Sequence, residues 1–159
     1  MNATPLPAVR AEQGRAPARD AARIWARATA RRDNLAVIPS LADKLSGIES
    51  ALAVDGALLL MARIGERAMA FSIVVPQRDV LEVLYLAVDP IAWGNGLARQ
   101  LLDHLRHHSV KARTPMELWV IDDNERAIAI YESAGWIPTS EVKVRNSAGR
   151  PERRYILAP

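Results

Sequence analysis

The sequence predicts a mixed α/β fold built on a partly antiparallel sheet. Two observations indicate it. The spacing of apolar residues changes several times between helix-like and strand-like periods, and three consecutive strand-like runs in the middle of the chain are joined by short polar turns. The expected order of elements is β-α-α-β-β-β-α-β-α-β-β, a mostly antiparallel mixed sheet of about seven strands flanked by about four helices.

Each element is expected from its local pattern. The expected helices cover residues 20–32, 41–54, 97–108 and 124–134. The expected strands cover residues 6–12, 57–65, 67–75, 80–88, 116–121, 136–144 and 153–158. Ser40 is placed to cap the second helix. The run from Val80 to Val88 is apolar almost throughout, which is typical of a strand that is buried on both faces.

Length and composition favour one compact domain over residues 1–159. The chain has 159 residues, 50% of them hydrophobic and 25% charged, which suffices for a single sizeable core. No run approaches the ~18 apolar residues of a membrane span, and no secretory leader is recognised. The sequence has no cysteine, which excludes disulfides and thiol catalysis. We expect a cytoplasmic protein without a membrane partner.

Charge is unevenly distributed along the chain. Residues 1–32 carry seven arginines and two acids, and residues 141–159 carry five bases and two acids, whereas the middle is acidic. Without interleaved aromatic residues this pattern does not indicate a nucleic-acid partner. Four arginines recur every fourth residue of the first helix, which favours a solvated face over a site for an acidic partner: Arg19, Arg23, Arg27 and Arg31.

The stretch after the fourth strand indicates an anion site. Asp89 and Pro90 end the strand, Gly94 and Gly96 follow one residue apart, and a helix begins at Leu97. Free N–H groups at a helix N-terminus attract phosphate, and glycines allow it to approach the backbone closely. The alternative is a tight connection in which Asn95 and Gly96 only turn the chain.

Two known phosphate loops fit this stretch poorly. A P-loop needs a lysine and a hydroxyl residue after its last glycine, where this chain has Leu97 and Ala98. A dinucleotide-binding fingerprint needs a third glycine, where this chain has Arg99, although Asp122 stands where its acidic residue is expected.

The stretch resembles instead the acetyl-CoA signature of the GNAT acyltransferase superfamily. Val88-Asp89-Pro90 matches its V-x-P element, and 93–98 matches [Arg/Gln]-x-x-G-x-[Gly/Ala] except that Trp93 replaces the usual arginine or glutamine. A second family element, N-x-x-A-x-x-x-Y-x-x-x-G-[Phe/Trp], matches at the same spacing: Asn124, Ala127, Tyr131, Gly135 and Trp136. The two motifs occur in the family's order.

The resemblance implies a GNAT-like fold and a set of coenzyme contacts. The backbone N–H of Leu86 would polarise the acetyl carbonyl, and Val88 would pair with the pantetheine amides. The remaining implied contacts with acetyl-CoA come from this strand, the glycine loop and the helix at 124–134: Ala87, Trp93, Gly94, Asn95, Gly96, Leu97, Ala98, Asn124 and Tyr131. Asn124 has a simpler interpretation as a helix-start residue, and Gly135-Trp136 as a helix end.

Two residues are candidates for proton transfer. Tyr131 resembles the family's general acid and shares a helix face with Asn124 and Ala127; the alternative is a core tyrosine. Glu82 is the carboxylate of an otherwise apolar strand, and burial would raise its pKa toward a value useful for a base. The alternative interpretation is that Glu82 is a solvated residue at the start of the strand, beside the polar turn.

The histidines do not form a convincing metal site. His104, His107 and His108 lie three and four residues apart, but Leu105 stands where a metalloprotease helix has glutamate. We expect no metal.

The predicted activity is N-acetyl transfer from acetyl-CoA to a primary amine by direct attack in a ternary complex. The acceptor, a small molecule or a protein amine, would bind between residues 35–40 and the last two strands, a placement that the resemblance implies. Two alternatives remain: an idle acyl-CoA-binding module and a nucleotide-binding oxidoreductase. A homodimer is the default oligomer, because a small sheet leaves an edge to cover.

Overall fold

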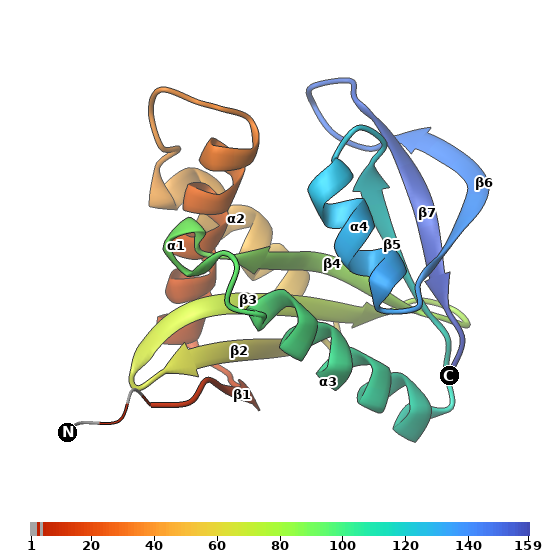
Figure 1. Cartoon of the computed structure of the whole chain (residues 1–159), viewed down its shortest axis with the longest axis horizontal. Coiled ribbons are helices and arrows are strands. Elements are labelled where there is room, and N and C mark those ends of the chain that lie inside the picture. Colours follow the sequence, from red (N-terminus) through yellow and green to blue (C-terminus); the bar gives the residue numbers. More distant parts are fainter. Residues whose placement is uncertain (1–2, 4) are drawn as a thin grey trace.

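The computed structural model describes residue 3 and residues 5–159 and contains one seven-stranded sheet in the order β1-β2-β3-β4-β5-β7-β6 (Figure 1). All neighbouring strands are antiparallel except β4 and β5. The strands are β1 (Ala8–Ala11), β2 (Leu58–Ile64), β3 (Arg67–Pro76), β4 (Leu81–Val88), β5 (Met116–Ile121), β6 (Ile137–Val144) and β7 (Pro151–Leu157). The predicted fold class is confirmed.

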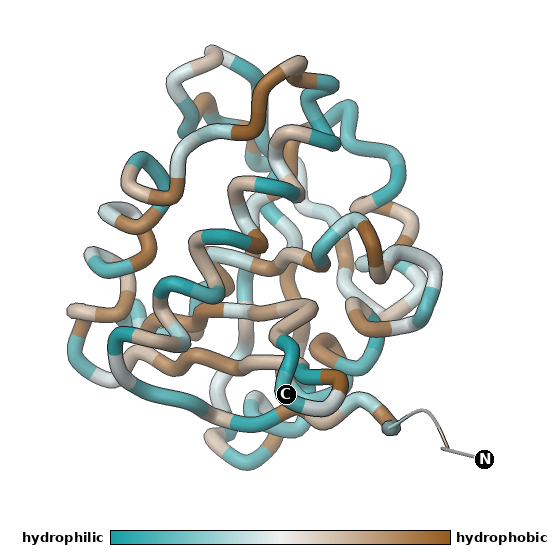
Figure 2. Tube along the Cα trace, turned by 90° about the vertical axis from the view of Figure 1, so that its left-hand side faces the viewer, coloured by the Kyte–Doolittle hydropathy of each residue, from teal (hydrophilic) through white to brown (hydrophobic). Residues whose placement is uncertain are grey.

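Four α-helices and one short 3₁₀ helix connect the strands. They are α1 (Arg15–Arg32), α2 (Leu41–Leu52), η1 (Pro90–Ala92), α3 (Leu97–Ala112) and α4 (Glu125–Ser133). The Ser40 hydroxyl accepts a hydrogen bond from the Asp43 N–H at 3.2 Å, so the predicted cap of α2 is confirmed. The tube in Figure 2 alternates between apolar and polar positions along the helices, as expected for helices with one face on a sheet.

The helices cover opposite faces of the sheet, with α1 and α2 on one face and α3 and α4 on the other (Figure 1). Two apolar cores result. Ile24, Ile48 and Phe71 belong to the core beneath α1 and α2. Leu101, Leu105 and Met116 belong to the core beneath α3, which also receives Trp136 and part of α4. The sheet is therefore buried from both sides along β2, β3 and the first half of β4.

The main departure from a regular sheet is the divergence of β4 from β5. The two strands pair only from Leu81 to Val83 on β4 and from Met116 to Leu118 on β5. Beyond that point they separate, as Figure 1 shows. The sequence predicted a strand buried on both faces, but Leu84, Tyr85 and Leu86 are only partly buried, because the neighbouring strand has turned away.

Several boundaries differ from the sequence prediction. α1 begins at Arg15 rather than Asp20, since Pro17 is tolerated in a first helical turn. α3 continues to Ala112 and ends where Arg113 takes a left-handed conformation, with φ of 51°. β1 is shorter than expected, and β7 begins at Pro151 rather than Arg153. The earlier start of β7 affects the site.

Candidate active site

The separation of β4 from β5 creates a cavity of about 850 Å³. It extends from the start of α3 at one end to the β6–β7 connection at the other. Its walls come from α1, β4, η1, the start of α3, β5, α4 and the beginning of β7. All the predicted coenzyme contacts except Asn95 line it. The structure therefore brings the two sequence motifs to one cavity.

The exposed edge of β4 presents backbone groups to this cavity. Asp89 donates its N–H to Met69 of β3 at 2.7 Å, so Ala87 and Tyr85 also direct their polar backbone groups toward β3. By alternation, Leu86 and Val88 direct theirs away from β3, toward the space left by β5. An extended ligand with amide groups can pair there as an additional strand.

The loop before α3 has unpaired backbone donors. Within the described chain, no N–H group from Gly94 to Ala98 donates a hydrogen bond, whereas the next turn begins with Gln100 N–H bonding to Gly96 carbonyl at 3.0 Å. These donors lie at the N-terminus of a 16-residue helix, where the helix dipole favours an anion.

Both glycines of the loop are required by backbone conformation. Gly94 has φ of 84° and Gly96 has φ of 76°, values that side-chain-bearing residues rarely adopt. A Cβ added at either position would meet no atom within 4 Å. It would project into open space and not into packed protein, so the loop leaves room for a ligand. The Asn95 side chain, by contrast, turns back and donates to Ala92 carbonyl at 3.1 Å.

Trp93, the departure from the family pattern, fixes the loop to β4. Its indole N–H donates to the Val88 carbonyl at 2.8 Å. The Arg126 guanidinium carbon lies 4.2 Å from the centre of its ring, and that of Arg31 lies 5.8 Å away. The indole therefore bonds the Val88 carbonyl, one of the backbone groups predicted to pair with pantetheine. It also holds the positive charges of Arg31 and Arg126 beside the loop.

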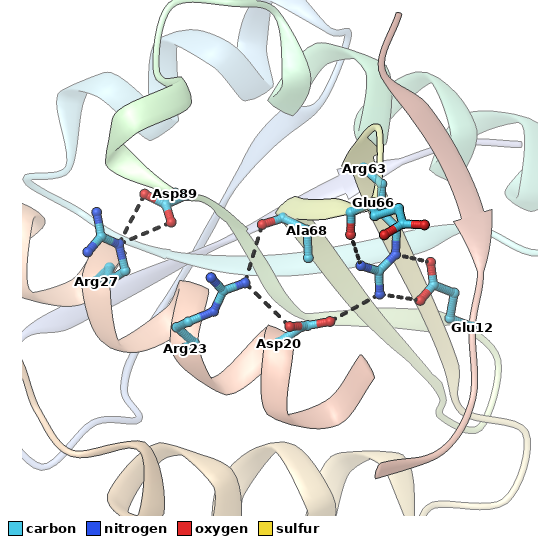
Figure 3. Close-up of polar contacts among 8 residues, drawn as sticks. All are labelled: Glu12, Asp20, Arg23, Arg27, Arg63, Glu66, Ala68 and Asp89. Atoms are coloured by element: carbon cyan, nitrogen blue, oxygen red, sulfur yellow. Dashed lines mark hydrogen bonds and ion pairs between the residues drawn. The ribbon is translucent and has the colours of Figure 1, made fainter. Parts of the chain in front are cut away.

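A buried ion pair anchors the end of β4. Asp89 is only 1% exposed, and both its carboxylate oxygens accept from the Arg27 Nε at 3.0 and 3.2 Å (Figure 3). One of these oxygens also accepts a hydrogen bond from the Ile91 N–H, which is the first N–H group of η1. Part of the arginine row of α1 thus contacts the rest of the protein and is not simply a solvated face: Arg23, Arg27 and Arg31.

Tyr131 projects from α4 into the cavity. Burial raises the pKa of its hydroxyl to about 12, and the nearby positive charge of Arg32 opposes this rise. The hydroxyl therefore stays protonated through the physiological range, as a proton donor must. Its ring lies 6.4 Å from that of Trp136.

The family element of α4 also shapes the helix itself. The Asn124 side chain accepts a hydrogen bond from the Ala127 N–H at 3.3 Å, so Asn124 is the N-cap of α4. Asn124 also lines the cavity. At the other end, Trp136 N–H bonds to Tyr131 carbonyl and Gly135 N–H to Glu132 carbonyl. With φ of 91° at Gly135, this is a Schellman motif. The predicted helix end is confirmed.

Glu82 lies outside the lining of the main cavity. It is 4% exposed, its Oε1 accepts from Arg145 at 2.9 Å and its Oε2 accepts from Gln77 at 3.1 Å. Both oxygens are thus held by residues of two strand connections, Gln77 between β3 and β4 and Arg145 between β6 and β7. Its role as the base stays a prediction, and a base in this position would first have to release Arg145.

Sequence reasoning missed several residues at the end of the cavity away from the glycine loop. They are Trp25, Trp119, Arg145, Asn146 and Glu152. Arg150 bonds Asp33 at 3.1 Å and Asp123 at 2.7 Å, so it joins the β6–β7 connection to the α1–α2 and β5–α4 connections. Residues 35–40, which were expected to border the acceptor, do not line the cavity.

The three histidines lie along α3. His104 and His107 are exposed. Within the described residues, no three histidine, cysteine or carboxylate side chains come together in a way that would hold a metal ion. In the same part of the chain, no helix is both long and apolar enough to cross a membrane.

The model of the acetyltransferase (GNAT) family matches residues 17–136, which contain the glycine loop, the exposed edge of β4 and Tyr131. The chain belongs to the GNAT acetyltransferase family. Its predicted fold and its acyltransferase class are thereby confirmed, and the nucleotide-binding oxidoreductase is not favoured.

A curated relative of this GNAT chain is the mycothiol acetyltransferase of Beutenbergia cavernae. It is 41% identical over 70 residues, which are 42% of this chain and 23% of that protein. The matched segment is therefore less than a quarter of the relative's length.

Solved GNAT structures share the fold over nearly the whole chain. The ribosomal-protein-S18-alanine N-acetyltransferase from Escherichia coli has a TM-score of 0.77 at 23% identity and covers 96% of this chain and 94% of its own. The structure of yncA from Salmonella typhimurium with its cofactor acetyl-CoA has a TM-score of 0.69 at 18% identity, covering 96% and 93%. At these identities the likeness concerns the fold.

Proposed function

We propose that this protein transfers the acetyl group of acetyl-CoA to a primary amine by direct attack in a ternary complex. The observation that carries the proposal is the pairing of two features along one cavity. Unpaired N–H groups at 94–98 suit a diphosphate, and the edge of β4 at Leu86 and at the N–H of Val88, whose carbonyl bonds Trp93, suits the amides of pantetheine. Acetyl-CoA carries both groups in this order.

The residues divide the chemistry between them. The Leu86 N–H faces away from β3, and as a backbone donor beside the thioester carbonyl it would stabilise negative charge on the carbonyl oxygen. Tyr131 holds a proton that can be given to the departing thiolate. Arg31 and Arg126, stacked near Trp93, add positive charge beside the diphosphate.

The amine acceptor would bind at the end of the cavity away from the glycine loop and would enter from the side of α1. We call this the acceptor end. Aromatic rings from Trp25, Tyr85 and Trp119 line it. Proteins of similar fold are named for different acceptors, among them a ribosomal-protein alanine and spermidine. The acceptor here is a small-molecule or protein amine.

The first experiment compares acetyl-CoA and NAD⁺ as ligands by thermal stability. A specific ligand present at 100 times its dissociation constant stabilises a protein by about 2.7 kcal/mol, so acetyl-CoA raises the melting temperature and NAD⁺ does not. Release of free CoA thiol with a panel of amines then separates the enzyme from an idle binder. Stabilisation by NAD⁺ alone would contradict the proposal.

A matched pair of variants locates the binding. Gly96→Ala and Gly65→Ala both place a Cβ at positive φ, 76° and 61°, where neither meets an atom closer than 3.8 Å. Each costs about 1–2 kcal/mol of stability from backbone strain. Only Gly96→Ala puts its methyl group beside the predicted diphosphate, so it alone weakens acetyl-CoA binding, by about tenfold or more. Equal affinities would refute the assignment.

A further inference from the structure

We propose that Glu152 binds the ammonium group of the acceptor and takes its proton, and that the acceptor carries a single ammonium group on a neutral or anionic body. The inference rests on the proposed acetyl transfer and names the substrate class of the same cavity. Neither sequence motif contains Glu152.

The register of β5 and β7 places Glu152 at the acceptor end. Ile121 of β5 lies opposite Glu152 of β7, so both side chains project from the same face of the sheet. Trp119, two residues before Ile121, shares that face. Leu118, Val120 and Tyr155 project the other way, into the core beneath α3 and α4. Glu152 therefore lines the cavity on the side of α1, opposite α4.

Glu152 is the one carboxylate among the described residues that line the cavity. The other carboxylates near this end are already paired with arginines. Arg145 holds Glu82 at 2.9 Å, Arg154 holds Glu117, and Arg153 holds Asp122 at 3.0 Å. Within the described chain, no arginine, lysine or histidine lies within salt-bridge distance of Glu152. Lys143, opposite Glu152 in the register of β6 and β7, pairs instead with Glu141 at 3.6 Å, and Arg150 pairs with Asp33 and Asp123. Its negative charge is available to a ligand.

The β6–β7 connection orients this carboxylate. The Asn146 Nδ2 donates to Glu152 Oε2 at 3.1 Å and to the Arg150 carbonyl at 2.7 Å, and its Oδ1 accepts from the Arg150 N–H at 3.1 Å. One oxygen of Glu152 is thus held by a neutral donor, and the other, Oε1, is left for the acceptor. Asn146 is a positioning residue.

The proton balance assigns each group one task. The acceptor ammonium gives one proton to Glu152, which passes it to solvent. The amine nitrogen then forms a bond to the thioester carbonyl carbon, and the carbon–sulfur bond breaks. Tyr131 protonates the departing thiolate and recovers its proton from the nitrogen of the new amide. The products are the acetylated amine, CoA thiol and one proton.

Charge at this end selects the class of acceptor. One unpaired carboxylate neutralises one ammonium group. The nearby basic lining residues are Arg32 and Arg145, each already paired with a carboxylate. A second or third ammonium group would find no free carboxylate there and would meet these arginines. A polyamine is therefore a poor acceptor, whereas a monoamine with a neutral or anionic body places no second cation beside these arginines.

The test compares three amines: L-phenylalanine, 2-phenylethylamine, which lacks the carboxylate, and spermidine. Their binding to the CoA-saturated protein is measured calorimetrically, and their acetylation by release of CoA thiol. The variants are Glu152→Gln and, as the matched control, Glu49→Gln on the exposed face of α2. Melting temperature and acetyl-CoA affinity are measured for both variants, to show that each remains folded.

We expect Glu152→Gln to lower kcat/KM for the amine by about 100-fold or more, the range of a lost general base, with acetyl-CoA affinity unchanged. Its kcat/KM should rise with pH up to the pKa of the free amine, because only the neutral amine then reacts. Glu49→Gln should behave as wild type. Spermidine should bind and react more weakly than both aromatic amines.

The outcomes separate this inference from the proposed function. If wild type acetylates an amine and Glu152→Gln matches it in rate and pH profile, the role of Glu152 is refuted and acetyl transfer stands. If amines bind only when Glu152 is present but no CoA is released, the amine site stands and acetyl transfer is refuted. If wild type binds none of the amines, or prefers spermidine, the inference is overturned.

Discussion

Tyr131 is the residue at which sequence motif and local environment agree most directly. The motif predicts a proton donor, and burial disfavours the ionised form of the hydroxyl, so that its pKa rises to about 12. A phenol with this pKa remains protonated at any pH at which the protein would work. It cannot produce the alkaline limb of a pH–rate profile below about pH 11.

Replacing Tyr131 tests its role. Tyr131→Phe keeps the ring packed beside Trp136 but removes the proton, so kcat should fall by about 100-fold while acetyl-CoA affinity stays within about twofold of wild type. An absorbance titration of the tyrosines should also lose its highest transition, near pH 12. An unchanged kcat would contradict the assignment of Tyr131 as the acid.

Trp93 and Glu152 show where residue-level prediction reaches its limit. The family motif has arginine or glutamine at 93, whereas the Trp93 indole of this chain bonds the Val88 carbonyl and stacks with Arg126. No spacing rule predicts that contact, because it joins a loop to α4. Glu152 was assigned to a loop, because the start of β7 was placed two residues late. Alternation along β7, together with its register against β5, is the signal that would have found it.

Among the elements, β4 and the loop before α3 form the functional unit, and α1 supports it. Arg27 of α1 bonds Asp89 at the end of β4 (Figure 3). Asp89 in turn accepts from the Ile91 N–H, the first N–H of η1. This chain of contacts fixes where the exposed edge of the strand ends and the glycine loop begins.

Removing Arg27 should disturb this connection. Arg27→Ala leaves the nearly buried Asp89 carboxylate without its cation, and we expect a loss of about 1–3 kcal/mol in the free energy of unfolding. Arg19→Ala, at an exposed position of the same helix, should cost less than about 0.5 kcal/mol. Urea unfolding of the two variants measures the difference. Equal midpoints would show that the ion pair contributes nothing to stability.

The elements themselves were largely predictable. All seven strands and four helices appear in the expected order, because helix and strand periods are local properties of the sequence. The divergence of β4 from β5 was not derivable from periodicity, since an apolar strand looks the same whether its neighbour continues or turns away. Only the pairing of Val88 with pantetheine, which the family resemblance implies, indicated that one edge of this strand is free. The motif residues were predictable because their spacing within one loop or one helix determines their relative positions.

At the scale of the whole molecule, the cavity lies between the two halves of the sheet, where β4 separates from β5. Its end near the glycine loop has arginines beside unpaired backbone donors, and its other end has aromatic side chains and Glu152. An anionic acetyl donor and an acceptor that carries one ammonium group would therefore bind at opposite ends of the cavity and meet where β4 separates from β5. The matched family model, residues 17–136, ends before β7, so the acceptor end is the part that the family alone describes least.

The most direct measurement of the central claim is a titration of ¹⁵N-labelled protein with CoA, followed through the backbone amide resonances. The N–H groups of Gly94, Asn95, Gly96, Leu97 and Ala98 should shift strongly as they bond to the diphosphate, while those of Gly65 and Gly14, in turns remote from the cavity, should not move. If CoA binds and shifts other resonances while those of 94–98 stay in place, the glycine loop does not hold the coenzyme, and the account is wrong.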